Sequence, residues 1–149
     1  MIIMTTIFIL FILLISFIFY KLFTKDPEIG VPTVGTFVEK PWGQEEIWAN
    51  HHPYVGKILH INNGCKLSLQ YHKNKDETIR VLNGILTLIV MNREDGKVFE
   101  LQEGEIFHII PRLVHRMEAR SGNVSVLETS TSELWDVVRL EDDYNRVQK

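Results

Sequence analysis

The stretch GCKLSLQYHKNKDETIRVLNG, residues 64–84, holds three polar side chains of the kind that bind metal ions. Gln70 and His72 are two residues apart, so on a strand they point to the same face. Glu77 follows a short polar break at 73–76 and begins the next apolar run. A hairpin bend in that break would bring all three side chains to one point. An imidazole, a carboxylate and an amide oxygen around one point predict a cation site.

Short apolar runs separated by turn residues continue on both sides of this stretch. Asn83-Gly84 is typical of a two-residue hairpin turn. Strands that recur about every 8–12 residues between glycine turns predict an all-β sandwich or barrel. No stretch after residue 24 has a helical period of useful length. The strands are predicted over 45–49, 55–61, 66–71, 78–82, 85–91, 98–101, 106–110, 114–119, 124–128 and 137–140.

The N-terminus has a different composition from the rest of the chain. Residues 1–20 carry no charged side chain, and a bilayer core needs about 20 apolar residues in a helix. No Lys or Arg precedes the run and no small-residue cleavage site follows it, which argues against a cleaved signal peptide. The prediction is one uncleaved transmembrane helix over 1–23. Lys21 and Lys25, directly after the run, predict a single-pass protein whose C-terminal domain lies on the cytoplasmic side.

The remaining composition limits the number of domains and the kinds of partner. Residues 24–36 hold two prolines and two glycines and are predicted to be a linker, and residues 37–149 are the length of one ordinary domain. The net charge is −3 and there is no basic run, so nothing points to nucleic-acid binding. Cys65 is the single cysteine, which excludes an internal disulfide.

A simpler interpretation of residues 64–84 is a surface hairpin whose polar side chains meet only water. In a small barrel, however, alternate residues of a strand face inward. Unpaired polar groups inside the barrel would cost several kcal/mol, and a bound cation would pair them. Both interpretations are open on the residues of this stretch alone.

The spacing of several motifs resembles that of a known family. Gly64, Gln70, His72, Glu77 and Gly84 have the spacing of the first cupin motif, in which the Gln70 position is usually histidine. Residues 37–146 are similar to type II mannose-6-phosphate isomerase, the cupin domain often fused behind a mannose-1-phosphate guanylyltransferase. The guanylyltransferase half has no counterpart in this sequence. The collinear signatures are PWG at 41–43, KLSLQYH at 66–72, HRME at 115–118 and DVVRLEDDY at 136–144.

This resemblance implies a cupin fold, which is a double-stranded β-helix or jelly-roll barrel, and a metal site. It adds His115, from the second cupin motif, to the set Gln70, His72 and Glu77. Two imidazoles, a carboxylate and an amide suit Zn²⁺, which we favour, or Mn²⁺ or Fe²⁺. The second motif departs from the family at Ile110, Arg112 and Ala119, where proline, glycine and asparagine are usual, and Asn74 replaces a further histidine. His51, His52, His60 and His108 lie outside the motifs.

The activity that the resemblance implies is aldose–ketose isomerisation of a sugar phosphate, in the biosynthesis of nucleotide sugars and polysaccharides. Such an enzyme moves a proton between C1 and C2, for which Glu118 and Lys57 are the candidate bases. Arg116, next to His115, is the first candidate to hold the phosphate. Further phosphate candidates are Arg80, Lys66 and Arg139.

Two other functions are compatible with the same motifs. One is a different metal enzyme, such as an iron dioxygenase that uses His72, Glu77 and His115 as a facial triad. The other is a membrane-tethered cupin that binds a sugar without catalysis, which the altered second motif favours. Pairing of two chains through strand edges is also an expectation of the resemblance.

Overall fold

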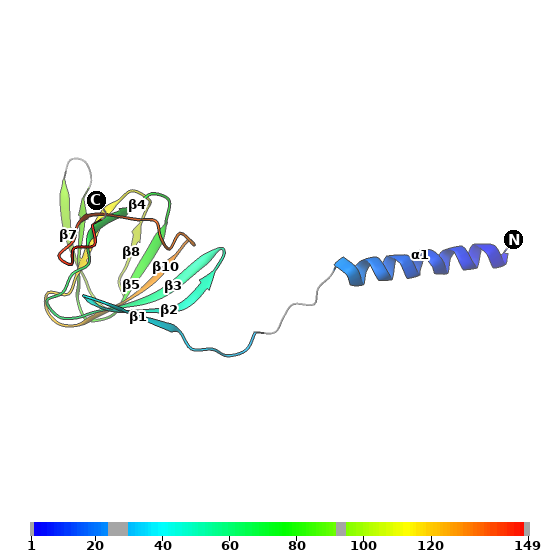
Figure 1. Ribbon diagram of the computed structural model, residues 1–149, viewed down its shortest axis with the longest axis horizontal. Coiled ribbons are helices and arrows are strands. Elements are labelled where there is room, and N and C mark those ends of the chain that lie inside the picture. The colour runs from blue at the N-terminus through cyan, green and yellow to red at the C-terminus, as the bar shows by residue number, and fades with distance from the viewer. Residues whose placement is uncertain (1, 24–29, 92–94, 148–149) are drawn as a thin grey trace. The chain divides into compact units, whose positions relative to one another are not determined.

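The computed structural model describes residues 2–23, 30–91 and 95–147. The chain divides into two compact units, Met1–Thr33 and Val34–Lys149. All the β-strands of the described residues lie in the second unit (Figure 1). Part of the predicted linker, 24–29, lies outside the described residues.

The first unit contains one helix, α1, over Ile2–Phe23. Within the described part of the chain, no helix is long and apolar enough to span a membrane. The predicted transmembrane anchor and membrane contact are therefore not supported, and the cytoplasmic location stays a prediction.

The second unit is a barrel-like pair of antiparallel sheets. One sheet has six strands in the order β1-β2-β3-β10-β5-β8, and the other has five in the order β11-β4-β9-β6-β7. The strands are β1 Thr36–Lys40, β2 Gly43–His51, β3 Tyr54–Ile61, β4 Leu69–His72, β5 Glu77–Asn83, β6 Leu86–Met91, β7 Gly96–Leu101, β8 Ile106–Ile109, β9 Val114–Glu118, β10 Val124–Ser130 and β11 Val137–Glu141. This architecture confirms the predicted all-β fold and fits a cupin jelly roll.

Two details of the strand prediction are corrected. Thr36–Lys40, part of which was assigned to the linker, is strand β1 and pairs with β2. The Asn83-Gly84 turn does not make a hairpin, because β5 pairs with β10 and β8 whereas β6 belongs to the other sheet. Gly84 has a φ of 83°, and a Cβ there would lie 2.5 Å from the Asn123 carbonyl oxygen, so the crossover requires glycine.

The interior has an apolar layer and a polar layer because inward positions change character along each strand. On β5 the inward side chains run from Glu77 to Ile79 and Val81, all buried. The same change from polar to apolar occurs on three other strands. Lys57 on β3 and His115 on β9 each lie two residues before a buried apolar side chain, and Glu128 on β10 lies two residues after one. The apolar layer comprises Trp42, Leu59, Ile61, Ile79, Val81, Leu86, Leu88, Leu101, Ile109, Met117, Ala119, Val124 and Val126.

Candidate metal centre

Three side chains from three strands form the candidate metal centre. His72 ends β4, Glu77 begins β5 and His115 lies on β9. The break at 73–76 is not a hairpin, since β4 and β5 belong to different sheets. It crosses from one sheet to the other, and His72 and Glu77 therefore meet inside the barrel. All three residues are buried, and their potential ligand atoms lie within 4.8 Å of one another.

Backbone carbonyls fix the tautomer of both imidazoles. His72 Nδ1 is 2.8 Å from the carbonyl oxygen of Asp136, and His115 Nδ1 is 3.0 Å from that of Leu113. A carbonyl oxygen only accepts hydrogen bonds, so each Nδ1 carries the proton and donates it. Each Nε2 is then a bare lone pair, and both are buried without a hydrogen-bond partner. This is the arrangement of metal-binding histidines.

The distances around Glu77 fit a shared cation better than direct hydrogen bonds. Glu77 Oε1 lies 3.8 Å from His72 Nε2 and 3.4 Å from His115 Nε2. Two ligand atoms at about 2.1 Å from one ion are about 3.0–3.4 Å apart at angles of 90–109°. Small adjustments of these side chains would therefore let all three bind one divalent ion.

A buried lysine, Lys75, contacts the other oxygen of Glu77. Its side chain is only 4% exposed, and its ammonium donates to Glu77 Oε2 and, at 2.6 Å, to Glu128 Oε1. Lys57 Nζ lies 3.8 Å from the same Glu128 oxygen. Two ammonium groups thus face two carboxylates, and this part of the interior is electrically balanced when the histidines are neutral.

Burial and these charges shift the pKa values of the cluster. Burial, assisted by Lys75, lowers the pKa of His72 to about 4, and burial also lowers the pKa of His115. Burial and the nearby Glu128 raise the pKa of Glu77 to about 7. Burial favours a higher pKa for Glu128, but the ammonium groups of Lys75 and Lys57 outweigh this effect and lower the pKa of Glu128 to about 2. Both imidazoles are therefore neutral near pH 7.

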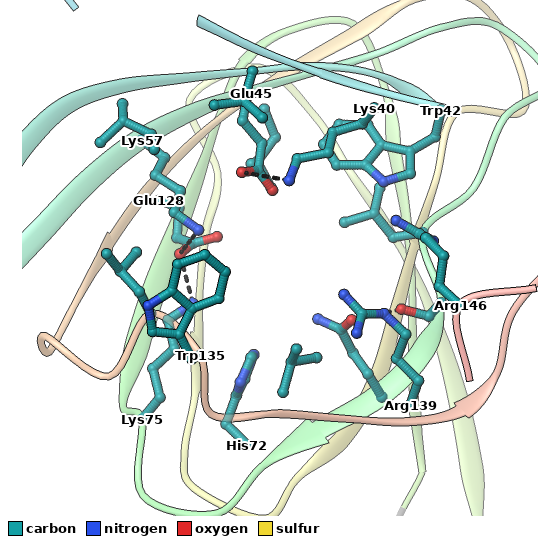
Figure 2. A pocket seen from close by; sticks show the side chains of 18 residues that line it. Lys40, Trp42, Glu45, Lys57, His72, Lys75, Glu128, Trp135, Arg139 and Arg146 are labelled. Atoms are coloured by element: carbon teal, nitrogen blue, oxygen red, sulfur yellow. Dashed lines mark hydrogen bonds and ion pairs between the residues drawn. The ribbon is translucent and has the colours of Figure 1, made fainter. Parts of the chain in front are cut away.

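His72 is at the boundary between this centre and an open cavity of about 210 Å³. Figure 2 shows Glu128 and Trp135 at one side of the cavity and Arg139 and Arg146 at the other. Gln70, the predicted fourth ligand, also lines the cavity. Its amide oxygen accepts a hydrogen bond of 2.7 Å from the Ser68 hydroxyl, and its place among the metal ligands remains a prediction.

The strand register places a guanidinium two strands away from the metal centre. Gln70 on β4 is the direct cross-strand partner of His115 on β9 and of Arg139 on β11. Directly opposite residues point to the same face, so the three form a row across the sheet. Neighbouring strands are about 4.8 Å apart, which puts the backbones of His115 and Arg139 roughly 10 Å from each other.

Several cationic side chains line the cavity. Within the described part of the chain, Arg139 is the one among them that forms no ion pair with a carboxylate. Lys40 pairs with Glu45 at 3.3 Å, and Arg146 is bound through two nitrogens to Asp142. The Nε of Arg139 is buried without a hydrogen-bond partner, although the side chain lines the cavity. A planar guanidinium left free in this way is suited to an anionic group of a ligand.

The predicted catalytic residues are divided between the cavity and the opposite face of β9. Lys57 lines the cavity, and its role as a base stays a prediction. Arg116 and Glu118 alternate with the inward-facing His115 and Met117, so they point away from the centre. They are paired there with Glu141 at 3.2 Å and with Arg120 at 2.7 Å, respectively.

The other predicted candidates lie apart from the cluster. Arg80 is exposed on β5, next to the buried Ile79, and Lys66 pairs with Asp143 at 3.0 Å. His60 contacts Ser125 and His108 contacts Asp76. Neither these two histidines nor His51 and His52 belong to the three-residue cluster.

The altered second motif keeps the backbone conformation that glycine would adopt. Arg112 has a φ of 68°, which is the left-handed region. Its backbone N–H donates to the carbonyl oxygen of His72 at 2.7 Å. The turn before β9 is therefore tied to β4, and His115 reaches the centre without the usual glycine.

Sequence reasoning missed three members of the site: Lys75, Glu128 and Asp136. Lys75 lay in a polar break that reads as exposed, and Glu128 stood at the end of a predicted strand. The alternation of Val124, Val126 and Glu128 was a usable signal, because it places Glu128 on the inward face. Asp136 acts mainly through its carbonyl oxygen, which no sequence pattern marks.

Comparison with solved structures supports the fold. Capsular polysaccharide assembling protein CapF from Staphylococcus aureus matches with a TM-score of 0.65 and 12% identity, over 72% of this chain and 34% of that one. Lactobacillus farciminis oxalate decarboxylase matches with a TM-score of 0.61 and 18% identity, over 71% and 33%. KdgF from Halomonas sp. matches with a TM-score of 0.57 and 15% identity, over 65% and 87%. This chain thus spans about a third of the first two proteins, and at these identities the likeness shows the fold alone.

Comparison of the sequence itself gives the family. No curated protein sequence matches significantly. The sequence model described as mannose-6-phosphate isomerase C-terminal matches residues 32–147, which is most of the chain and includes every strand. The metal-centre residues, the cavity and the jelly-roll fold all lie within that match. The chain therefore belongs to the mannose-6-phosphate isomerase C-terminal family of cupin domains.

Proposed function

We propose that this protein is a metal-dependent isomerase that interconverts the aldose and ketose forms of a sugar phosphate, with mannose 6-phosphate as the first candidate substrate. The observation that carries the proposal is the pair of bare, buried Nε2 atoms of His72 and His115 on either side of Glu77. Membership of the family supports the reaction class. The biosynthesis of nucleotide sugars and polysaccharides is the corresponding proposed context.

The residues of the centre fit a divalent cation. His72, Glu77 and His115 supply two neutral imidazoles and one carboxylate, a set that suits Zn²⁺, Mn²⁺ or Fe²⁺. Zn²⁺ remains our first choice, with Gln70 as a proposed fourth ligand. Such an ion supplies Lewis-acid polarisation of a sugar carbonyl and stabilises the negative charge of an enediolate.

The chain's own residues would position the sugar between two ends of the cavity. Arg139, two strands from His115, is suited to hold the phosphate through its free guanidinium. The carbonyl end would then lie at the metal centre. A sugar phosphate has this polarity, because its reacting carbons and its phosphate are at opposite ends.

Proton transfer between C1 and C2 needs a group that lines the cavity. Lys57 and Glu128 do so, and their charged atoms are 3.8 Å apart. The pair offers one proton donor and one proton acceptor at the same wall. We therefore propose Lys57 and Glu128 for this role in place of Glu118, which faces away from the cavity.

A second candidate function is metal-independent binding of a sugar phosphate. The specific observation in its favour is Lys75, whose ammonium contacts both Glu77 and Glu128 and, together with Lys57, balances their charges from within the chain. In that case the centre would hold its shape without a cation, and the cavity would bind without turnover.

A coupled assay on the full chain tests the proposal. Metal-loaded protein is expected to convert mannose 6-phosphate to fructose 6-phosphate. Glu77→Gln is expected to reduce turnover by about 10³-fold or more, while Glu103→Gln, in an exposed turn, leaves it unchanged. Metal-loaded protein that binds the sugar phosphate without turnover would exclude the isomerase and favour the binding function. Oxygen uptake by iron-loaded protein would instead point to a dioxygenase.

A further inference from the structure

One aromatic side chain at the cavity has no structural explanation. Trp135 is 93% exposed and yet lines the cavity. The other tryptophan of the cavity, Trp42, is 2% exposed and belongs to the apolar core. A large apolar ring left in water is unfavourable unless something covers it for part of the time.

Trp135 lies on a loop that is anchored at both ends. This loop, residues 131–136, joins β10 to β11. The Asp136 carboxylate accepts hydrogen bonds from the backbone N–H groups of Asn74 at 2.5 Å and Lys75 at 2.9 Å. At the other end of the loop, the Thr131 N–H donates to the Asp76 carbonyl oxygen at 3.0 Å.

The same loop contacts the candidate metal centre. The carbonyl of Asp136, the residue after Trp135, accepts the Nδ1 proton of His72. The indole is thus one residue from the group that orients a proposed metal ligand. Figure 2 shows Trp135 and Arg139 at opposite sides of the cavity, whose lining also includes Glu128. A ligand that spans the two sides would contact both the ring and the guanidinium.

We infer that Trp135 is the platform on which the ring of the sugar phosphate stacks, and that it sets the preference for a cyclic sugar. One face of a pyranose ring presents C–H groups, which suit the face of an indole. The phosphate would extend to Arg139 and the anomeric end to the metal centre. This inference rests on the proposed function. The anchored loop favours it, because a platform held in advance loses little freedom when the ligand binds.

Isothermal titration of the full-length protein with three probes tests the platform. The probes are mannose 6-phosphate, glycerol 3-phosphate, which has the phosphate without a ring, and free mannose, which has the ring without the phosphate. Trp135→Ala is expected to weaken mannose 6-phosphate binding about tenfold and to leave glycerol 3-phosphate binding unchanged within about twofold. Trp135→Phe is expected to restore most of the affinity. Trp48→Phe is the control, because Trp48 packs over Gly56 away from the cavity lining.

Fluorescence gives a second readout that a merely structural role would not produce. In Trp48→Phe protein, saturation with mannose 6-phosphate is expected to shift the emission to shorter wavelength, because an exposed indole becomes covered. Mannose 6-phosphate that binds wild type and Trp135→Ala equally well would overturn the platform and leave the proposed function standing. Wild-type protein that binds none of the three probes would overturn both. A loss of affinity for mannose 6-phosphate and glycerol 3-phosphate alike would also overturn the platform, since the effect would not depend on the ring.

Discussion

The rings of His72 and His115 face each other across the interior, with their centroids 5.6 Å apart and their planes inclined by 36°. Each donates its Nδ1 proton to a backbone carbonyl and turns a bare Nε2 toward Glu77. Two buried lone pairs without donors are unfavourable in a protein that has no use for them. The pair is the main reason to expect a bound cation.

Lys75 is expected to oppose metal binding. Its ammonium occupies Glu77 Oε2 and adds a positive charge beside the proposed ion. Lys75→Met should raise the affinity for Zn²⁺ at least tenfold, measured by competition with a chelator of known affinity. The same variant should destabilise metal-free protein by about 3–5 kcal/mol, because Glu128 keeps only Lys57 as a partner. Lys97→Met, on the exposed part of β7, is the control. Unchanged or weaker Zn²⁺ affinity in Lys75→Met would show that Lys75 does not compete with the ion.

Proton release on metal binding should reflect the shifted pKa values. Glu77, with a pKa raised to about 7, is partly protonated below pH 7, whereas His72, with a pKa lowered to about 4, is already neutral. A cation binds the ionised carboxylate, so at pH 5.5 it displaces about one proton from Glu77, and at pH 8 almost none. The association constant should therefore rise up to about tenfold per pH unit and level off above pH 7.

Calorimetry in buffers of different ionisation enthalpy measures these protons directly. Unshifted histidines with pKa values near 6.5 would release about two protons at pH 5.5 in addition to any from Glu77. Release of two or more protons at that pH would therefore contradict the electrostatic description of the centre.

The left-handed conformation of Arg112 should carry a cost that glycine removes. Arg112 is exposed and has a φ of 68°, which is unfavourable for a residue with a Cβ. Arg112→Gly is expected to raise the free energy of unfolding by about 0.5–1 kcal/mol in urea denaturation, after allowance for the greater freedom of glycine in the unfolded chain. Arg112→Ala keeps the Cβ and should change little. A loss of stability in Arg112→Gly would mean that the arginine side chain itself stabilises the turn.

His72 and Glu77 were predicted because their spacing is local, whereas His115 was added by the resemblance to the second cupin motif. His72 and Glu77 were expected to meet through a hairpin, and they meet through a crossover between sheets. Local turn chemistry at 73–76 and at Asn83-Gly84 does not encode which sheet the next strand joins. That choice depends on long-range pairs, such as β10 between β3 and β5.

The same limit explains the catalytic residues that sequence reasoning favoured. Arg116 and Glu118 are close to His115 in sequence, but the two-residue period of β9 turns them to the other face. Lys57 and Glu128 are 71 positions apart and are direct cross-strand partners in the structure. No local pattern joins them, although the inward alternation of each strand was visible.

Elemental analysis of the purified chain, residues 1–149, never exposed to chelator, tests the central claim most directly. The cluster predicts about one divalent ion per chain in wild type and in His52→Ala, whose imidazole is exposed and lies outside the cluster. It predicts less than about a tenth of that amount in folded His115→Ala protein, because one of three ligands is lost. Wild-type protein without any divalent metal, or His115→Ala protein with an undiminished content, would contradict the claim that His72, Glu77 and His115 hold a metal ion.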